Sequence, residues 1–141
     1  MKKGLILILL IFLIGCNSKP KGLKGFEQVD IILENRANGQ YQEAVVYDLR
    51  EGQACFDGHI KGFTCIFYQT DLSVDDVFNN INKVYSKKAL VLLICEDGEI
   101  SKALANRLSE VGYQKVYYFH GGYLEYCQQN ANYIPEIGCD C

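Results

Sequence analysis

One cysteine of this 141-residue chain stands where a sequence can place a reactive sulfur. Cys95 follows a continuous apolar run, residues 89–94, which is typical of a strand buried on both faces. A loop with a central glycine comes next, made of Glu96, Asp97, Gly98, Glu99, Ile100 and Ser101, and helical spacing of apolar residues follows it. We expect N–H groups of this loop and of the helix N-terminus to surround the sulfur and stabilise a thiolate or a persulfide. The alternative is an inert cysteine that fills the core.

Strand-like and helix-like segments alternate on both sides of this loop. The expected strands are residues 26–29, 44–47, 63–68, 89–94 and 116–119. Ser73 and Asp76 have the spacing of a capping box and predict the start of a helix between two of these strands. The alternation predicts an α/β fold with a central parallel sheet of about five strands and helices on both faces. Functional crevices of such sheets lie at the carboxyl ends of strands, where Cys95 is expected.

Two groups of motifs give the chain a family resemblance. The first group is Asp48-Leu49-Arg50-Glu51, Gly58-His59-Ile60 and Gly62; the second is the cysteine loop, Gly112-Tyr113, Val116-Tyr117 and Gly121-Gly122. In this order, over residues 25–127, they resemble the two halves of a rhodanese-like domain. The resemblance implies a rhodanese-like fold and a sulfurtransferase that needs no cofactor. In that chemistry Cys95 takes a sulfane sulfur from a donor such as thiosulfate, holds it as a persulfide and passes it to an acceptor.

The loop departs from the pattern of active members of that family, which commonly carry basic residues just after the cysteine and just before the serine. Here those positions hold Glu96 and Ile100, with Asp97 and Glu99 between them. Carboxylates near a thiol raise its pKa and repel anionic donors. We therefore expect weak use of thiosulfate, and a neutral or cationic small donor, or a protein thiol or persulfide, as partner.

The N-terminal segment has the pattern of a bacterial lipoprotein signal. Lys2 and Lys3 precede an apolar run, residues 5–14, which is too short for an ordinary membrane-spanning helix. The run ends in Leu13-Ile14-Gly15-Cys16, which resembles a lipobox. We expect residues 1–15 to be removed, Cys16 to be lipidated and residues 16–24 to form a flexible tether. The protein would then be anchored by lipid in the bacterial cell envelope, facing outside the cytoplasm; an uncleaved anchor or an ordinary signal peptide is the alternative.

The net charge and the remaining cysteines limit the possible partners, disulfides and metal sites. A net charge of −3, made more acidic by loss of Lys2 and Lys3, argues against nucleic acid as a partner. The other cysteines are Cys55, Cys65, Cys127, Cys139 and Cys141, the last two in a C-terminal tail, residues 128–141. Their pairing cannot be read from the sequence, although a disulfide involving Cys127 or one tail cysteine is favoured. None of the spacings is that of a structural zinc site, so we expect no metal.

Three functions remain open. The first is a sulfurtransferase that works through Cys95. The second is a non-catalytic binding module with the same fold. The third is a thiol–disulfide redox protein that uses Cys95 and a tail cysteine. In each of them we expect Asp48 to pair with Arg50, and His59 to have a structural role.

Overall fold

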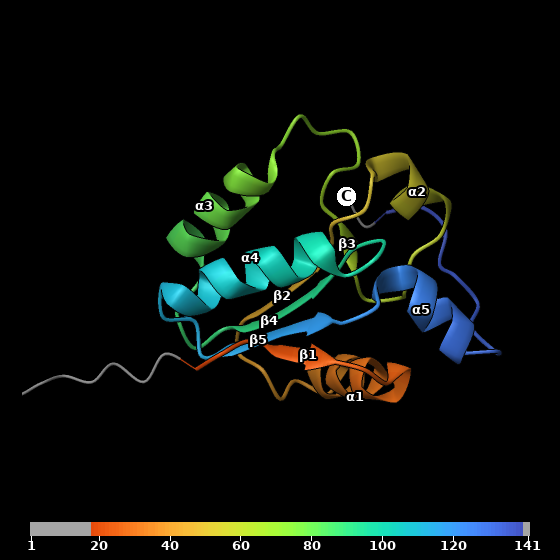
Figure 1. Ribbon diagram of the computed structural model, residues 1–141, viewed down its shortest axis with the longest axis horizontal. Coiled ribbons are helices and arrows are strands. Elements are labelled where there is room, and N and C mark those ends of the chain that lie inside the picture. Colours follow the sequence, from red (N-terminus) through yellow and green to blue (C-terminus); the bar gives the residue numbers. More distant parts are fainter. Residues whose placement is uncertain (1–17, 140–141) are drawn as a thin grey trace, which may run out of the picture.

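The computed structural model describes residues 18–139 and shows one parallel sheet with helices on both faces (Figure 1). The strands are β1 (Lys21–Leu23), β2 (Ala44–Asp48), β3 (Thr64–Cys65), β4 (Leu90–Ile94) and β5 (Lys115–Phe119), in the order β1-β5-β4-β2-β3. The helices are α1 (Phe26–Ala37), α2 (Gly52–Asp57), α3 (Val74–Val84), α4 (Glu99–Glu110) and α5 (Gly122–Gln129). The predicted α/β fold is confirmed. No helix between residues 18 and 139 is long and apolar enough to cross a membrane.

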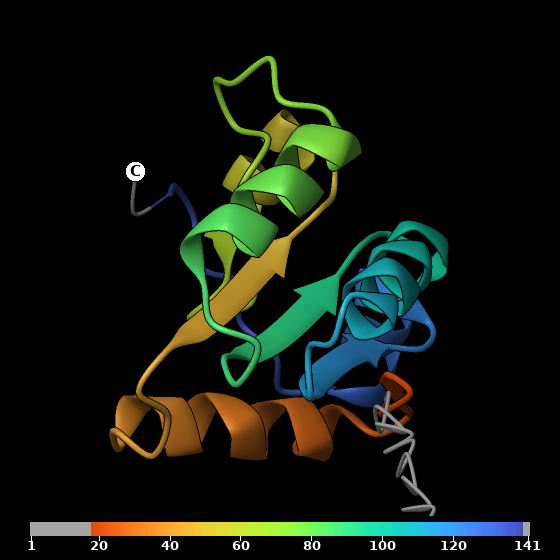
Figure 2. The ribbon, with the colours of Figure 1, turned by 90° about the vertical axis from the view of Figure 1, so that its left-hand side faces the viewer.

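The central strand β4 is buried along its whole length and serves two hydrophobic cores. Val91 and Leu93 pack into the core beneath α3 and α4, whereas Leu90, Leu92 and Ile94 pack into the core on the α1 and α5 side. Figures 1 and 2 show α1 on the face of the sheet opposite α3 and α4. The continuous apolar run of β4 is therefore explained by burial on both faces, with residues alternating between the two cores.

The edge of the sheet differs from the sequence expectation. The strand predicted at residues 26–29 is wrong, because the chain is already helical from Phe26; the helix start is held by Gln28, whose side-chain oxygen accepts the Gly25 N–H at 3.2 Å. The first strand lies earlier, at Lys21–Leu23, and pairs with β5. The flexible tether expected there is therefore wrong for these three residues. Gly22 permits this strand because a Cβ would come within 2.9 Å of the Tyr118 hydroxyl.

The strand predicted at residues 63–68 is much shorter in the structure. Only Thr64 and Cys65 pair with β2. On either side the backbone turns: the Phe63 N–H donates to the Ile60 carbonyl at 3.0 Å, and the Tyr68 N–H to the Cys65 carbonyl at 3.2 Å. These turn hydrogen bonds replace the ladder that the β-branched and aromatic composition had suggested.

Candidate active site

Cys95 lies directly after β4, at the carboxyl end of the central strand. Its carbonyl accepts the Tyr123 N–H at 2.8 Å, and the next carbonyl, of Glu96, accepts the Leu124 N–H at 3.3 Å. Both donors belong to the first turn of α5, so this helix fixes the start of the loop. The predicted position of the cysteine, at the mouth of a parallel sheet, is thus what the structure shows.

Ser101 supplies the polar contacts of the Cys95 sulfur. The Ser101 N–H donates to Sγ at 3.3 Å, and the thiol donates to the Ser101 hydroxyl oxygen, also at 3.3 Å. The hydroxyl in turn donates to the Gly98 carbonyl at 3.0 Å. Cys95 is 1% exposed and otherwise packs in the core beneath α3 and α4.

The loop is tighter than the sequence predicted, because α4 begins inside it. Glu99, Ile100 and Ser101 form the first turn of α4, so the expected six-residue loop is wrong in its second half. The Glu99 N–H donates to Asp97 Oδ1 at 3.0 Å instead of facing the sulfur. Among the described residues, the one backbone amide hydrogen-bonded to Sγ is that of Ser101. The expected ring of amides around the thiol is therefore reduced to one amide and one hydroxyl.

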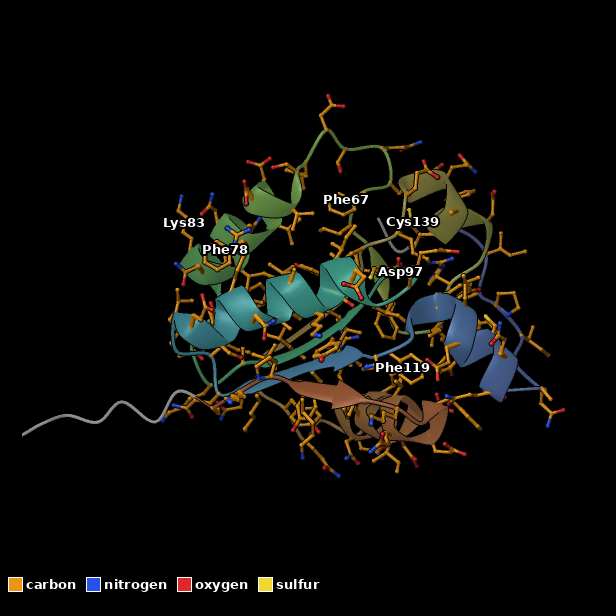
Figure 3. All side chains as sticks on the ribbon, viewed as in Figure 1. Phe67, Phe78, Lys83, Asp97, Phe119 and Cys139 are labelled. Atoms are coloured by element: carbon orange, nitrogen blue, oxygen red, sulfur yellow. A yellow bond between two sulfur atoms is a disulfide. The ribbon has the colours of Figure 1, made fainter. Side chains whose placement is uncertain are left out.

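Asp97 brings a negative charge close to the sulfur. Its Oδ1 lies 4.0 Å from Cys95 Sγ, and its side chain sits at the N-terminal end of α4 (Figure 3). Two like charges at that distance repel by about 1 kcal/mol in water and by about 4 kcal/mol near a protein surface. Asp97 therefore accepts the first N–H of α4 and at the same time places a carboxylate oxygen 4.0 Å from the Cys95 sulfur.

Asp97 is itself exposed, as are the other charged side chains of the loop. Glu96, Glu99 and Ile100 are exposed, and so is Lys102, the nearest basic residue along the chain. Exposure lets solvent and salt screen these carboxylates. The negative charges of Glu96 and Glu99 therefore act on a donor that approaches the loop more than on the Cys95 sulfur.

Two glycines allow the loop to lie against the turn that opens α5. Gly98 has φ of +92°, and a Cβ there would come within 2.0 Å of the His120 carbonyl oxygen. Gly122 has φ of +71°, and its Cβ would come within 2.3 Å of the Glu96 carbonyl oxygen. Only glycine fits either position without moving backbone. This contact explains physically why the loop glycine and the Gly121-Gly122 pair occur together.

Arg50 is the buried cation near this loop, and it is already engaged. Two of its nitrogens donate to Asp48, the shortest bond being 2.7 Å, and Nη2 also donates to the Gly58 carbonyl at 2.7 Å. Its guanidinium covers the Tyr123 ring at 3.5 Å. Burial lowers the pKa of Arg50 but the bonds to Asp48 raise it, and the net pKa lies above the ordinary value. The expected Asp48–Arg50 pair is confirmed, and it ties the guanidinium to the end of β2 and to the Gly58 carbonyl.

The favoured disulfide, at Cys127 or at one tail cysteine, does not involve Cys127 but does involve the tail cysteine Cys139. The structure has a disulfide between Cys55 and Cys65, a pairing that no pattern in the sequence predicts. Cys127 is a free, half-buried thiol on α5; burial raises its pKa, against the opposing effects of Tyr123 and Arg50. Cys139 lies in the tail near α2 (Figure 3) and takes part in a disulfide. Cys16 and Cys141 lie outside the described residues.

Comparisons with known proteins agree with the fold. A family model described as "Rhodanese-like domain" matches residues 28–129. The thiosulfate sulfurtransferase GlpE of Tolumonas auensis is 29% identical over 84 residues, which make up 60% of this chain and 73% of that protein.

Two solved structures share the fold. The reduced Bacillus anthracis CoADR-RHD superposes with a TM-score of 0.60 at 22% identity and is matched over 83% of this chain. This chain spans only 18% of that protein's chain. The Alr3790 protein from Anabaena sp. has a TM-score of 0.55 at 18% identity, over 78% of this chain and 80% of its own. At these identities the likeness shows the fold alone.

Proposed function

Because the chain belongs to the rhodanese-like family, we propose that it is a membrane-anchored sulfurtransferase that carries sulfane sulfur as a persulfide on Cys95 and uses thiosulfate weakly. The observation that carries this proposal is the Ser101 amide, which donates to Cys95 Sγ at 3.3 Å at the carboxyl end of β4. A backbone donor aimed at sulfur at the N-terminus of a helix is suited to an anionic sulfur species.

The proposed reaction has two half-reactions that balance. In the first, the Cys95 thiolate attacks the outer sulfur of the donor, the donor's S–S bond breaks and the donor's remaining thiolate or sulfite leaves. The Cys95 proton ends on that leaving group or in water. In the second, an acceptor thiolate attacks the outer sulfur of the Cys95 persulfide, its S–S bond breaks, and the Cys95 thiolate returns.

The charges of the loop support a donor other than thiosulfate. Asp97 lies 4.0 Å from the sulfur, Glu96 and Glu99 line the approach, and the guanidinium of Arg50 is bound to Asp48. An anionic donor thus meets carboxylates without an available buried cation in the described loop. The better donors are a neutral or cationic small persulfide, or a persulfide carried by a protein.

Membrane attachment through a lipid on Cys16 completes the proposal. Its support is the sequence of residues 1–16. The sheet begins at Lys21, so a lipid on Cys16 would place the domain close to the membrane surface. Metabolic labelling with a radioactive fatty acid tests this: labelled protein is expected for the natural chain and unlabelled protein for Cys16→Ser.

Intact-mass measurement tests the sulfurtransferase proposal and its two alternatives. The protein is incubated with polysulfide and weighed; a gain of one sulfur atom that Cys95→Ser abolishes and Cys127→Ser retains is expected. Loss of two hydrogens between Cys95 and a tail cysteine on mild oxidation would favour a redox protein instead. No mass change under either condition would favour a binding module.

A further inference from the structure

A second cluster of reactive side chains lies on the far side of β2 from Cys95, between α2 and β3. It consists of Cys55, His59 and Cys65, whose two sulfurs and one ring nitrogen all lie within 4.8 Å of one another. All three residues are at most 5% exposed. The two sulfurs are joined as a disulfide, which closes the cluster in this structure. Two thiols and an imidazole, once free, are a donor set that zinc prefers.

His59 is held in a way that suits a metal ligand. Its Nδ1 lies 3.2 Å from the Cys55 carbonyl oxygen, and its Nε2 lies 3.5 Å from Glu136 Oε2. If one ring nitrogen binds a metal held by the two sulfurs, the other nitrogen can still donate its N–H to a nearby oxygen. Metal-binding histidines usually have such a second hydrogen bond. Two backbone hydrogen bonds between His59 and Glu136, of 2.9 and 2.8 Å, fix the carboxylate beside the ring. Glu136 belongs to the tail beyond residues 28–129, the part matched by the family model.

We propose that Cys55, His59 and Cys65 form a redox-gated zinc site, which is closed as a disulfide and binds Zn²⁺ when a dithiol opens it. The dithiol gives two electrons and two protons to the Cys55–Cys65 bond and leaves as its own disulfide. Zinc then displaces the two thiol protons. Two thiolates and one Zn²⁺ sum to zero charge with a neutral imidazole, which a buried site tolerates, whereas Cu⁺ would leave a net negative charge.

The proposed site would keep α2 fastened to β3 in both redox states. The loop between the two cysteines contains Gly58, whose carbonyl accepts the Arg50 Nη2 hydrogen bond at 2.7 Å. Zinc would therefore replace the disulfide as a cross-link under reducing conditions and preserve the support of Arg50. This inference does not depend on sulfur transfer at Cys95.

Zinc stoichiometry measured in both redox states tests the proposal. The purified full chain is reduced anaerobically with a dithiol, freed of reductant, equilibrated with Zn²⁺ and desalted, and bound zinc is measured. We expect about one zinc per reduced chain and none in the oxidised chain. The same proposal can be tested on the natural chain by alkylation followed by peptide mapping. Bound zinc should protect Cys55 and Cys65 from alkylation, but not Cys95 or Cys127.

Variants assign the bound metal to its ligands. Cys55→Ser with Cys65→Ser should abolish binding, and His59→Gln, which can still occupy the buried space, should weaken it about 100-fold. Glu136→Gln should weaken binding about tenfold through the loss of the carboxylate beside the ring. Cys139→Ser with Cys141→Ser, and Cys95→Ser, are matched controls that should still bind one zinc.

The mapping on the natural chain keeps the test valid even if a variant fails to fold. Zinc that leaves Cys55 and Cys65 open to alkylation would overturn the proposal. Zinc lost with the tail cysteines, or no zinc at all in the reduced natural chain, would overturn it as well.

Discussion

The Cys95 sulfur lies between polar groups and apolar side chains. Ser101 supplies an amide and a hydroxyl, each 3.3 Å from Sγ. Apolar residues bury the sulfur, and the Asp97 carboxylate oxygen Oδ1 lies 4.0 Å from it. The reactivity of this cysteine is therefore sensitive to single charges, which makes it open to direct tests.

Asp97→Asn should increase the reactivity of Cys95. An asparagine keeps a side-chain oxygen to cap the Glu99 N–H but removes the charge beside the sulfur. Removing about 1 kcal/mol or more of repulsion should raise the rate of polysulfide loading at neutral pH roughly tenfold. Glu110→Gln, an equal charge change at the far end of α4, is the control and should leave the rate unchanged. An unaltered rate in Asp97→Asn would show that this carboxylate does not act on the sulfur.

Glu96→Arg combined with Ile100→Arg should increase thiosulfate use. The two exposed side chains flank the loop, and arginines there would attract the dianionic donor that the natural loop repels. We expect kcat/KM for thiosulfate to rise by about tenfold or more, with a smaller effect at high salt. Glu110→Arg again provides the remote control. If kcat/KM for thiosulfate stays the same, these positions do not face the donor.

Cys127 should react slowly with alkylating agents. Burial raises its pKa, and a raised pKa means a smaller thiolate fraction at a given pH. For the same reason the folded state loses stability when the pH rises through the range in which an unfolded thiol ionises. Iodoacetamide labelling is measured by mass mapping at a series of pH values. The pH at which half of Cys127 is labelled should be higher than the corresponding pH for an unfolded control peptide. Half-labelling of Cys127 at the same pH as the control peptide, or at a lower pH, would contradict the argument that burial raises its pKa.

At the level of helices and strands, the sequence was informative where one pattern dominated. The apolar run before Cys95 and the Ser73–Asp76 capping box predicted β4 and α3 because burial and capping are local in origin. β1 was missed because three residues containing Gly22 carry no strand pattern and become a strand only through pairing with β5. The Cys55–Cys65 bond and the hydrogen bond from the Glu99 N–H to Asp97 were also missed, since both depend on how distant or irregular segments are brought together.

Gly98→Ala should destabilise the fold through a contact between elements. Gly98 and Gly112 both have positive φ, of +92° and +102°, but only Gly98 lies against backbone, the His120 carbonyl. Gly112→Ala should cost about 1 kcal/mol from the left-handed conformation alone. Gly98→Ala should cost about 3 kcal/mol or more and slow sulfur loading, because the loop must move. The free energy of unfolding of both variants is measured in urea. Equal decreases would show that the loop does not depend on the close approach of Gly98 to the His120 carbonyl.

At the scale of the whole molecule, the sheet places the cysteine loop at the carboxyl end of its central strand, β4, against the first turn of α5. The loop is fixed there by the hydrogen bonds of Tyr123 and Leu124, while Arg50 is held by Asp48 and Gly58. The C-terminal tail adds Glu136 against His59, next to the disulfide. The domain thus combines a sulfur at the carboxyl end of the central strand with a separate disulfide-linked cluster between α2 and β3.

Locating the transferred sulfur is the most direct test of the central claim. The protein is loaded with polysulfide, its persulfide is trapped with an alkylating agent, and the peptides are mapped by mass, with and without prior treatment with an acceptor thiol. The account predicts one extra sulfur atom on the peptide that contains Cys95, removed by the acceptor. An extra sulfur on Cys127 alone, or one on Cys95 that the acceptor cannot remove, would contradict it.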